Sequence, residues 1–382
     1  MEQSRPVKNN TYILDIDSMD RQGMGIARLW GMAVFIPYAL AGERAEVQII
    51  KVAKRYAVGR LLRIISPSPA RTEPPCPYFR RCGGCTFMHL DYPAQLEIKR
   101  KETEQTLRRI SGLDIKVEGC RGMKEPYHYR NKAQFPLQMG KDGVKIGFYA
   151  PRSHRVVEQH DCLLQPEIFR TVVDIVGRWA KHTGLPIYDE TTGKGILRHL
   201  YIREAEATGE IQVCLVCTSG KLPDTHALID SLRREVPGLV SVMVNLNRED
   251  TNVVLGGKGF VLWGREWITD ELCGLRFRLS PQSFYQVNRR QAEILYGIAG
   301  DFASPGPEDT VLDLYCGAGT ITLALSDHAK KVLGAEIVPE AIDDARENAA
   351  RNGVKNAEFF CGDASAVGKS IKLVFIIINK YT

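Results

Sequence analysis

The sequence predicts a multidomain protein with three parts: an N-terminal OB-like β-barrel over residues 1–66, a central α+β domain over 67–280 and a C-terminal α/β Rossmann-like domain over 281–382. Three observations predict this architecture. Five short apolar strands separated by turns fill Thr11–Ile65, as in a small closed barrel. Strand-like segments dominate Tyr127–Gly256, and a buried strand runs directly into a glycine-rich turn at Val311–Thr320.

Composition restricts the class of protein. With 382 residues, 44% of them hydrophobic and 25% charged, the chain has the makeup of a soluble globular protein with two or three domains. The formal net charge of +6 is compatible with a nucleic-acid partner but does not establish one. We find no signal-peptide pattern and no apolar run of membrane-spanning length, and the ten cysteines do not form a secreted disulfide framework. We therefore expect a cytoplasmic protein, and we expect it to be a monomer.

The predicted barrel contains the strands Tyr12–Leu14, Gly25–Leu29, Ala33–Ile36, Arg44–Val52 and Ala57–Ile65. Basic residues follow its last two strands, namely Lys51, Lys54, Arg55, Arg60 and Arg63. Small barrels of this kind often bind single-stranded nucleic acid, although a solvated basic edge explains the same residues equally well. Four prolines between Ser66 and Pro75 mark the first domain boundary.

Three cysteines close to a Gly83-Gly84 turn predict a metal or cluster site. Cys76, Cys82 and Cys85 lie within ten residues, so their thiols can converge on one point. A fourth ligand has to come from elsewhere, and Cys162 is the best candidate, with His160 as the rival. Four thiolates suit either zinc or an iron–sulfur cluster, and the spacing does not decide between them.

The other six cysteines are interpreted as structural. Cys214 and Cys217 form a C-x-x-C, but they belong to the alternating strand Glu210–Thr218. Residues three apart in a strand point to opposite faces, so these thiols cannot share a metal or close a redox disulfide. The remaining four are isolated in the sequence: Cys120, Cys273, Cys316 and Cys361.

Two helices are predicted before the α/β domain. Asp91–Gly112 carries a basic outer face and an apolar face that includes Leu107 and Ile110, and a second helix spans roughly Gln165–Lys181. Hairpin turns are expected at 141–143, 207–209 and 248–250. The polar trio Arg130-Asn131-Lys132 suits phosphate binding near the aromatic residues before it, and an exposed strand edge would use the same residues.

The glycine-rich stretch predicts an S-adenosylmethionine (SAM) site. Asp313-x-x-x-Gly317-x-Gly319 follows a buried strand, and glycine permits the tight turn and the close approach of a ligand. A nicotinamide-binding loop would need a third glycine where Thr322 stands. An ordinary strand–turn–helix is the alternative, and Glu336 counts against it because an acid seventeen residues after Gly319 suits the two hydroxyls of a ribose. Two further polar residues are placed to meet a cofactor: Asp363 for an adenine amino group, and Gln286.

Several segments together resemble the bacterial RNA (uracil-5)-methyltransferases that act on 23S ribosomal RNA, a family that includes tRNA-modifying relatives. The matching pieces are a barrel similar to the TRAM domain, the four cysteines, RNKAQ at Arg130–Gln134, LRHL at Leu197–Leu200, SFYQVN at Ser283–Asn288 and DLYCGAGT at 313–320. They cover nearly all of residues 10–365. The resemblance implies a [4Fe-4S] cluster on Cys76, Cys82, Cys85 and Cys162, which makes the central part an iron–sulfur domain. It also implies a SAM site lined by Gln286, Tyr315, Glu336 and Asp363.

The family's chemistry predicts what these 382 residues lack. A cysteine thiolate adds to C6 of uracil, C5 then attacks the sulfonium methyl group, and a base removes the C5 proton. In the family the fourth strand leads into Asp-Pro-Pro-Arg, with the nucleophile and the catalytic acid further on. Here Leu373–Ile378 is followed by Asn379–Thr382. We therefore expect no catalytic residue within the chain, a truncated and incomplete SAM domain, and no activity from this chain alone.

Other functions are kept as alternatives. The chain could be a non-catalytic RNA-binding iron–sulfur protein, a uracil-5 methyltransferase of tRNA instead of rRNA, or a methyltransferase with another substrate such as a protein. SAM binding without RNA affinity would favour the last of these, whereas covalent capture of 5-fluorouridine RNA would favour the uracil chemistry.

Overall fold

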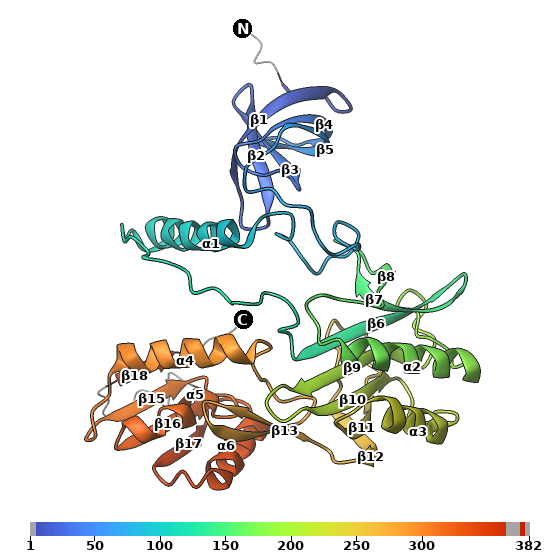
Figure 1. The fold of residues 1–382 in the computed structure, drawn as a ribbon, viewed down its shortest axis with the longest axis vertical. Coiled ribbons are helices and arrows are strands. Elements are labelled where there is room, and N and C mark those ends of the chain that lie inside the picture. Colours follow the sequence, from blue (N-terminus) through green and yellow to red (C-terminus); the bar gives the residue numbers. More distant parts are fainter. Residues whose placement is uncertain (1–4, 364–374, 379–382) are drawn as a thin grey trace. The chain divides into compact units, whose positions relative to one another are not determined.

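The computed structural model describes residues 5–363 and 375–378, the latter by their backbone only (Figure 1). It divides into two compact units, each described here by itself. Unit 1 contains residues 1–126 and 149–153, and unit 2 contains residues 127–148 and 154–382. No helix in the part of the chain that the structure describes is long and apolar enough to cross a membrane.

Unit 1 begins with a closed five-stranded barrel, as predicted. Its strands are β1 (Thr11–Met19), β2 (Met24–Leu29), β3 (Met32–Pro37), β4 (Arg44–Val52) and β5 (Tyr56–Ser66), in the order β1-β2-β3-β5-β4. Alternate residues point inward and form a core of small and branched side chains, among them Val34, Ile36 and Val47. Gly59 lies against that core, where an added Cβ would be 2.3 Å from Val47 Cγ1. The alternating apolar pattern thus closes the barrel because every second side chain is buried.

Unit 1 also contains the predicted helix, with the predicted ends. α1 (Tyr92–Thr106) is capped by Asp91, whose Oδ1 accepts a hydrogen bond of 2.8 Å from Ala94 N–H, and a π-helical turn, η1 (Leu107–Ser111), ends at the left-handed Gly112. Its apolar face is not buried. No residue of α1 or η1 is buried, although the structure describes all of them, and Ile110 is 81% exposed.

The basic face of α1 is partly neutralised by its own neighbours. The Arg100 guanidinium binds Glu97 and Glu104, and Arg108 binds Asp114. A salt bridge on a helix surface neutralises a basic side chain that could otherwise bind an acidic ligand. The face is therefore less basic than the sequence indicates.

Unit 2 contains a seven-stranded sheet in the order β12-β11-β10-β9-β6-β7-β8. The strands are β6 (Lys132–Gly140), β7 (Gly143–Tyr149), β8 (Val156–Glu158), β9 (Leu197–Ala205), β10 (Glu210–Cys217), β11 (Leu239–Leu246) and β12 (Lys258–Gly264). Two of the three hairpin turns are short, as expected. The third is wrong in length, because the loop between β11 and β12 runs from 247 to 257 and is held by the side-chain amides of Asn245 and Asn247.

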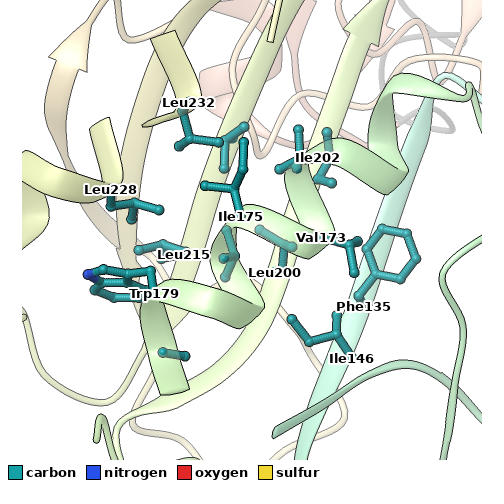
Figure 2. Close-up of a cluster of buried hydrophobic side chains, with 14 of the residues drawn as sticks. Phe135, Ile146, Val173, Ile175, Trp179, Leu200, Ile202, Leu215, Leu228 and Leu232 are labelled. Atoms are coloured by element: carbon teal, nitrogen blue, oxygen red, sulfur yellow. The ribbon is translucent and has the colours of Figure 1, made fainter. Parts of the chain in front are cut away.

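Helices α2 (Ile168–Thr183) and α3 (Thr225–Glu235) cover one face of this sheet. Figure 2 shows Trp179 and Ile175 of α2 packed with Leu200 and Leu215 of the sheet, next to Leu228 of α3. α3 was not predicted from the sequence, although its buried residues Leu228, Ile229 and Leu232 recur at helical spacing.

The C-x-x-C of β10 has the predicted geometry. Cys217 belongs to the helix-covered core, whereas Cys214 packs with Tyr201, Val216 and Met243 on the other face. Burial raises the pKa of both thiols, so neither supplies a thiolate at neutral pH.

The C-terminal part of unit 2 is an α/β domain. A hairpin of β13 (Ile268–Leu272) and β14 (Leu275–Leu279) precedes α4 (Arg289–Ala303). The parallel sheet has the order β17-β16-β15-β18. Its elements are β15 (Thr310–Leu314), α5 (Thr320–Ala324), the 3₁₀ turn η2 (Ser326–His328), β16 (Lys331–Glu336), α6 (Pro339–Arg351), β17 (Ala357–Cys361) and β18 (Phe375–Ile378).

The predicted fourth strand is present, because β18 pairs in parallel with β15. The first two residues of the predicted strand and the four residues after it, Asn379–Thr382, lie outside the described residues.

Candidate cofactor site

The glycine loop connects β15 to α5 through backbone conformations that favour glycine. Tyr315, Gly317 and Gly319 all have positive φ, of 71°, 54° and 81°. Gly319 also has no room for a side chain, because an added Cβ would lie 3.1 Å from the Phe359 ring and 3.2 Å from Ala345. Phe359 fills the same kind of space over Gly334, where an added Cβ would be 2.6 Å from its ring. The loop therefore lies close against α6 and β17.

Asp313, near the end of β15, connects this strand to α5 through a side-chain hydrogen bond. Its carboxylate is fully buried, and Oδ2 accepts a hydrogen bond of 2.7 Å from Thr322 Oγ1. Its other oxygen has no hydrogen-bond partner among the described residues. Burial, with a smaller contribution from the nearby charge of Glu336, raises the pKa of this carboxyl to about 7. The side chain therefore joins the strand end to the start of α5 and does not reach the surface.

Glu336 spans the loop from the end of the neighbouring strand. Its Oε2 accepts a hydrogen bond of 3.2 Å from Gly317 N–H, and its Oε1 accepts from Ile337 N–H at 2.8 Å and Val338 N–H at 3.0 Å. The amide of Tyr315 donates to Ala335 O at 2.8 Å, so the two strand ends are fixed side by side. The half-exposed carboxylate is thereby held at the carboxyl edge of the sheet, where α/β folds bind ligands.

The third strand end supplies Asp363. β17 pairs with β16 up to Glu336 and Cys361, and Gly362 N–H donates to Glu336 O at 2.9 Å. Asp363 follows and is exposed. Three predicted residues, Tyr315, Glu336 and Asp363, thus follow three neighbouring parallel strands.

Apolar side chains at this edge were missed by the sequence analysis. Ile337, 64% exposed, and Val338 directly follow Glu336, and Tyr315 is exposed beside them. An exposed apolar pair after an acid at a strand end suits the flat ring of a nucleoside. That order of residue types was the signal in the sequence.

Gln286 is held by the RNK segment, although the two are far apart in the sequence. Asn131 Nδ2 donates to Gln286 O at 2.9 Å, and Asn131 N–H donates to Val287 O at 2.9 Å. The buried Arg203 donates to Ser280 O and Ser283 O at 2.8 and 2.9 Å. These bonds fix the loop Ser280–Asn288 to the central sheet.

The Gln286 side chain offers an unused donor. Its Nε2 is buried and has no hydrogen-bond partner among the described residues. The loop that carries it also contacts the α/β domain, because Ser283 Oγ donates to Asp344 Oδ2 of α6 at 3.2 Å. A buried amide without a partner costs free energy, so it is a candidate contact for a polar ligand.

Two cysteines lie near this site, and Cys316 lacks the properties of a nucleophile. Cys316 is buried, and burial raises the pKa of its thiol far from neutrality. Cys361 is exposed, and its Sγ lies 3.8 Å from Ile337 O.

The cysteine-rich loop of unit 1 has an ordered backbone. Cys76, Cys82 and Cys85 are partly exposed, and Cys82 Sγ accepts a hydrogen bond of 3.3 Å from Gly84 N–H. Gly83 N–H donates to Tyr149 O at 2.9 Å, and an added Cβ on Gly83 would lie 3.0 Å from that oxygen. Within the described residues, no three His, Cys, Asp or Glu side chains are arranged to hold a metal ion.

Cys162, in unit 2, is also partly exposed. Its rival His160 lies between two carboxylates, with Nδ1 3.2 Å from Asp174 Oδ1 and Nε2 3.6 Å from Glu158 Oε1. Both ring nitrogens of His160 therefore already face acids.

Two domain families match the sequence. The TRAM domain matches residues 8–62, and a methyltransferase domain matches residues 306–379. These are the barrel and the part of the chain that contains the glycine loop.

The chain is similar over nearly its whole length to curated RNA methyltransferases. It is 43% identical to an uncharacterized RNA methyltransferase of Clostridium tetani, covering 99% of this chain and 84% of the relative. It is also 43% identical to one of Halalkalibacterium halodurans, covering 96% and 80%.

Among solved structures, the Pyrococcus abyssi tRNA (uracil-54, C5)-methyltransferase in complex with S-adenosyl-L-homocysteine is 25% identical. It matches with a TM-score of 0.73 over 92% of this chain and 79% of that one.

Proposed function

Because this chain belongs to the RNA methyltransferase family, we propose that its reaction is the transfer of a methyl group from SAM to C5 of a uridine in RNA. The observation that carries the proposal is the similarity, over 92% of the chain, to a uracil-C5 methyltransferase. The predicted site residues on three neighbouring strand ends support it.

The residues at the carboxyl edge fit SAM. The Glu336 carboxylate suits ribose hydroxyls, and Tyr315 and Ile337 offer apolar surface to the adenine. Gln286 Nε2 is a buried donor that a polar group of the cofactor would satisfy. When bound, SAM supplies an electrophilic methyl group on a sulfonium. Asp313, Gly317 and Gly319 shape the loop, and we assign them no contact with the reacting atoms.

Uracil C5 is a weak nucleophile, which is why we propose the covalent mechanism of a thiolate added to C6. The buried, un-ionised Cys316 is unsuited to that role. Phe284, exposed on the Ser280–Asn288 loop, is placed to contact an unstacked base.

We propose ribosomal RNA as the substrate on the family resemblance, with tRNA as the second candidate. The tRNA alternative is favoured by the solved structure to which the chain is similar. Mass mapping of 5-methyluridine in rRNA and tRNA from a deletion strain separates the two, because only the true substrate loses the modification.

We also propose a [4Fe-4S] cluster on Cys76, Cys82, Cys85 and Cys162. Four cysteine thiols are a suitable donor set for such a cluster. We choose Cys162 over His160 as the fourth ligand because both ring nitrogens of His160 already face carboxylates. Methyl transfer requires no electron, so the cluster would stabilise the fold or position RNA.

The test of the function uses two measurements on the purified chain. SAM binding is measured by calorimetry, and covalent capture is measured with 5-fluorouridine RNA and SAM. We expect these 382 residues to bind SAM. An adduct would show that a nucleophile exists within them, and absent SAM binding would contradict the proposed function.

A further inference from the structure

We propose that Trp30, at the tip of the β2–β3 hairpin, is a stacking platform for an unpaired base of the RNA substrate. This inference rests on the proposed function only in taking RNA as the substrate.

The turn that carries Trp30 is a poor place for a bulky residue. Leu29 pairs with Met32, so Trp30 and Gly31 form a two-residue turn, with φ of 49° and 81°. Turns with two positive φ values favour Asn, Asp or Gly, and a large aromatic residue in that conformation is strained. Asparagine would form the same turn at lower cost. The strain is therefore explained by a use for the ring rather than by the fold.

The Trp30 ring is exposed to solvent and is held in place by a neighbouring aromatic ring. Trp30 is 54% exposed, and the Tyr12 ring packs edge-on against it with centroids 5.5 Å apart and planes at 86°. Arg28 Nη1 donates to Gly31 O at 3.4 Å, which keeps a guanidinium beside the turn. An indole with a neighbouring cation is a combination that binds a base and its phosphate.

The charge of the barrel selects RNA over a protein partner. Residues 5–66 contain ten basic and five acidic residues. Asp15 and Glu46 pair with arginines of the barrel, and Glu43 pairs with Arg71. Most of the remaining ionised groups on the barrel are therefore cations. A positive surface with an exposed aromatic ring suits single-stranded nucleic acid.

The test measures binding of the full chain to two fluorescein-labelled probes, a 12-nucleotide oligouridylate and a blunt 12-base-pair RNA duplex. We expect Trp30→Asn to raise the Kd for oligouridylate roughly 5- to 150-fold, the range for loss of one stacked base, and to leave the Kd for the duplex unchanged. Trp30→Phe should retain most of the affinity. Because stacking releases no counterions, the salt dependence of oligouridylate binding should not change in Trp30→Asn.

A thermal melt excludes a merely structural role. Trp30→Asn should melt at the same or a higher temperature than the wild type, since asparagine relieves the strain of the turn. Ile50→Asn, at another exposed apolar position of the barrel, is the control and should leave oligouridylate binding unchanged. Unchanged oligouridylate affinity in Trp30→Asn would overturn the inference and leave the proposed function intact. If the wild type binds SAM but neither probe, both the RNA substrate and this inference are contradicted.

Discussion

At the scale of single residues, Glu336 tests the cofactor site most directly. Glu336→Ala removes a carboxylate that accepts three backbone hydrogen bonds and faces the ligand edge. We expect the Kd for SAM to rise at least about tenfold, because charge-assisted hydrogen bonds contribute roughly 1.5–3 kcal/mol each. RNA affinity should be nearly unchanged. Calorimetry with SAM and a gel shift with RNA measure the two, and equal losses in both would indicate unfolding instead.

Asp313 makes stability depend on pH. Its pKa rises from 3.8 when unfolded to about 7 when buried, so the folded state holds its proton more tightly. Between about pH 4 and pH 7 the folded chain binds more protons than the unfolded chain, and this group's contribution falls as pH increases. Asp313→Asn keeps an oxygen for Thr322 and removes the ionisation. We expect its melting temperature to exceed that of the wild type at pH 8 and to approach it at pH 4.5. A constant difference across that range would contradict the assignment.

At the scale of elements, the hydrogen bonds of Asn131 position Gln286. Asn131→Ala removes the donor to Gln286 O, and we expect about 1 kcal/mol of lost stability with a raised Kd for SAM. Asn131→Asp is a second variant, which keeps the size but replaces the donor by an acceptor and should behave like alanine. Both the Kd for SAM and the melting temperature are measured. A raised Kd with only a small fall in melting temperature indicates lost positioning of Gln286, and a large fall in melting temperature indicates unfolding. Wild-type SAM affinity in both variants would show that Asn131 has no part in positioning Gln286.

The sequence predicts elements best where one period governs a long segment. All five barrel strands and the first two helices were predicted, because alternation and end caps are local signals. The helix α3 was not predicted, although Leu228, Ile229 and Leu232 recur at helical spacing. The long loop after β11 was not predicted because the side-chain amides of Asn245 and Asn247 hold it. For α1, spacing predicts an apolar face but not whether another element covers it.

The positions of the site residues at strand ends could be predicted from the sequence, but the hydrogen bonds that hold the Gln286 loop could not. Tyr315, Glu336 and Asp363 follow from the order of parallel strands. Asn131 and Arg203, which hold the Gln286 loop, lie 155 and about 80 residues away from it in sequence, so no spacing rule could connect them.

At the scale of the whole molecule, the cysteines test the proposed cluster. We expect anaerobically purified protein to be brown, with iron and sulfide near four each per chain. Cys82→Ser and Cys162→Ser should both lose iron and melt at lower temperature, whereas Cys120→Ser, which changes an exposed cysteine, should lose neither. A colourless wild type with one zinc would overturn the cluster, and retention of iron by Cys162→Ser would exclude that residue as a ligand.

The ring of Phe359 occupies the space above two glycines, Gly319 and Gly334, that come from separate elements. In evolutionary terms, these three positions cannot drift independently. A lineage that acquires alanine at 334 has to shrink residue 359 at nearly the same time, because the intermediate with both side chains would be overpacked. Homologous sequences should therefore show linked changes at 334 and 359. Position 319 should stay glycine even when the ring is gone, because its left-handed backbone favours glycine and an added Cβ would still lie 3.2 Å from Ala345 Cβ.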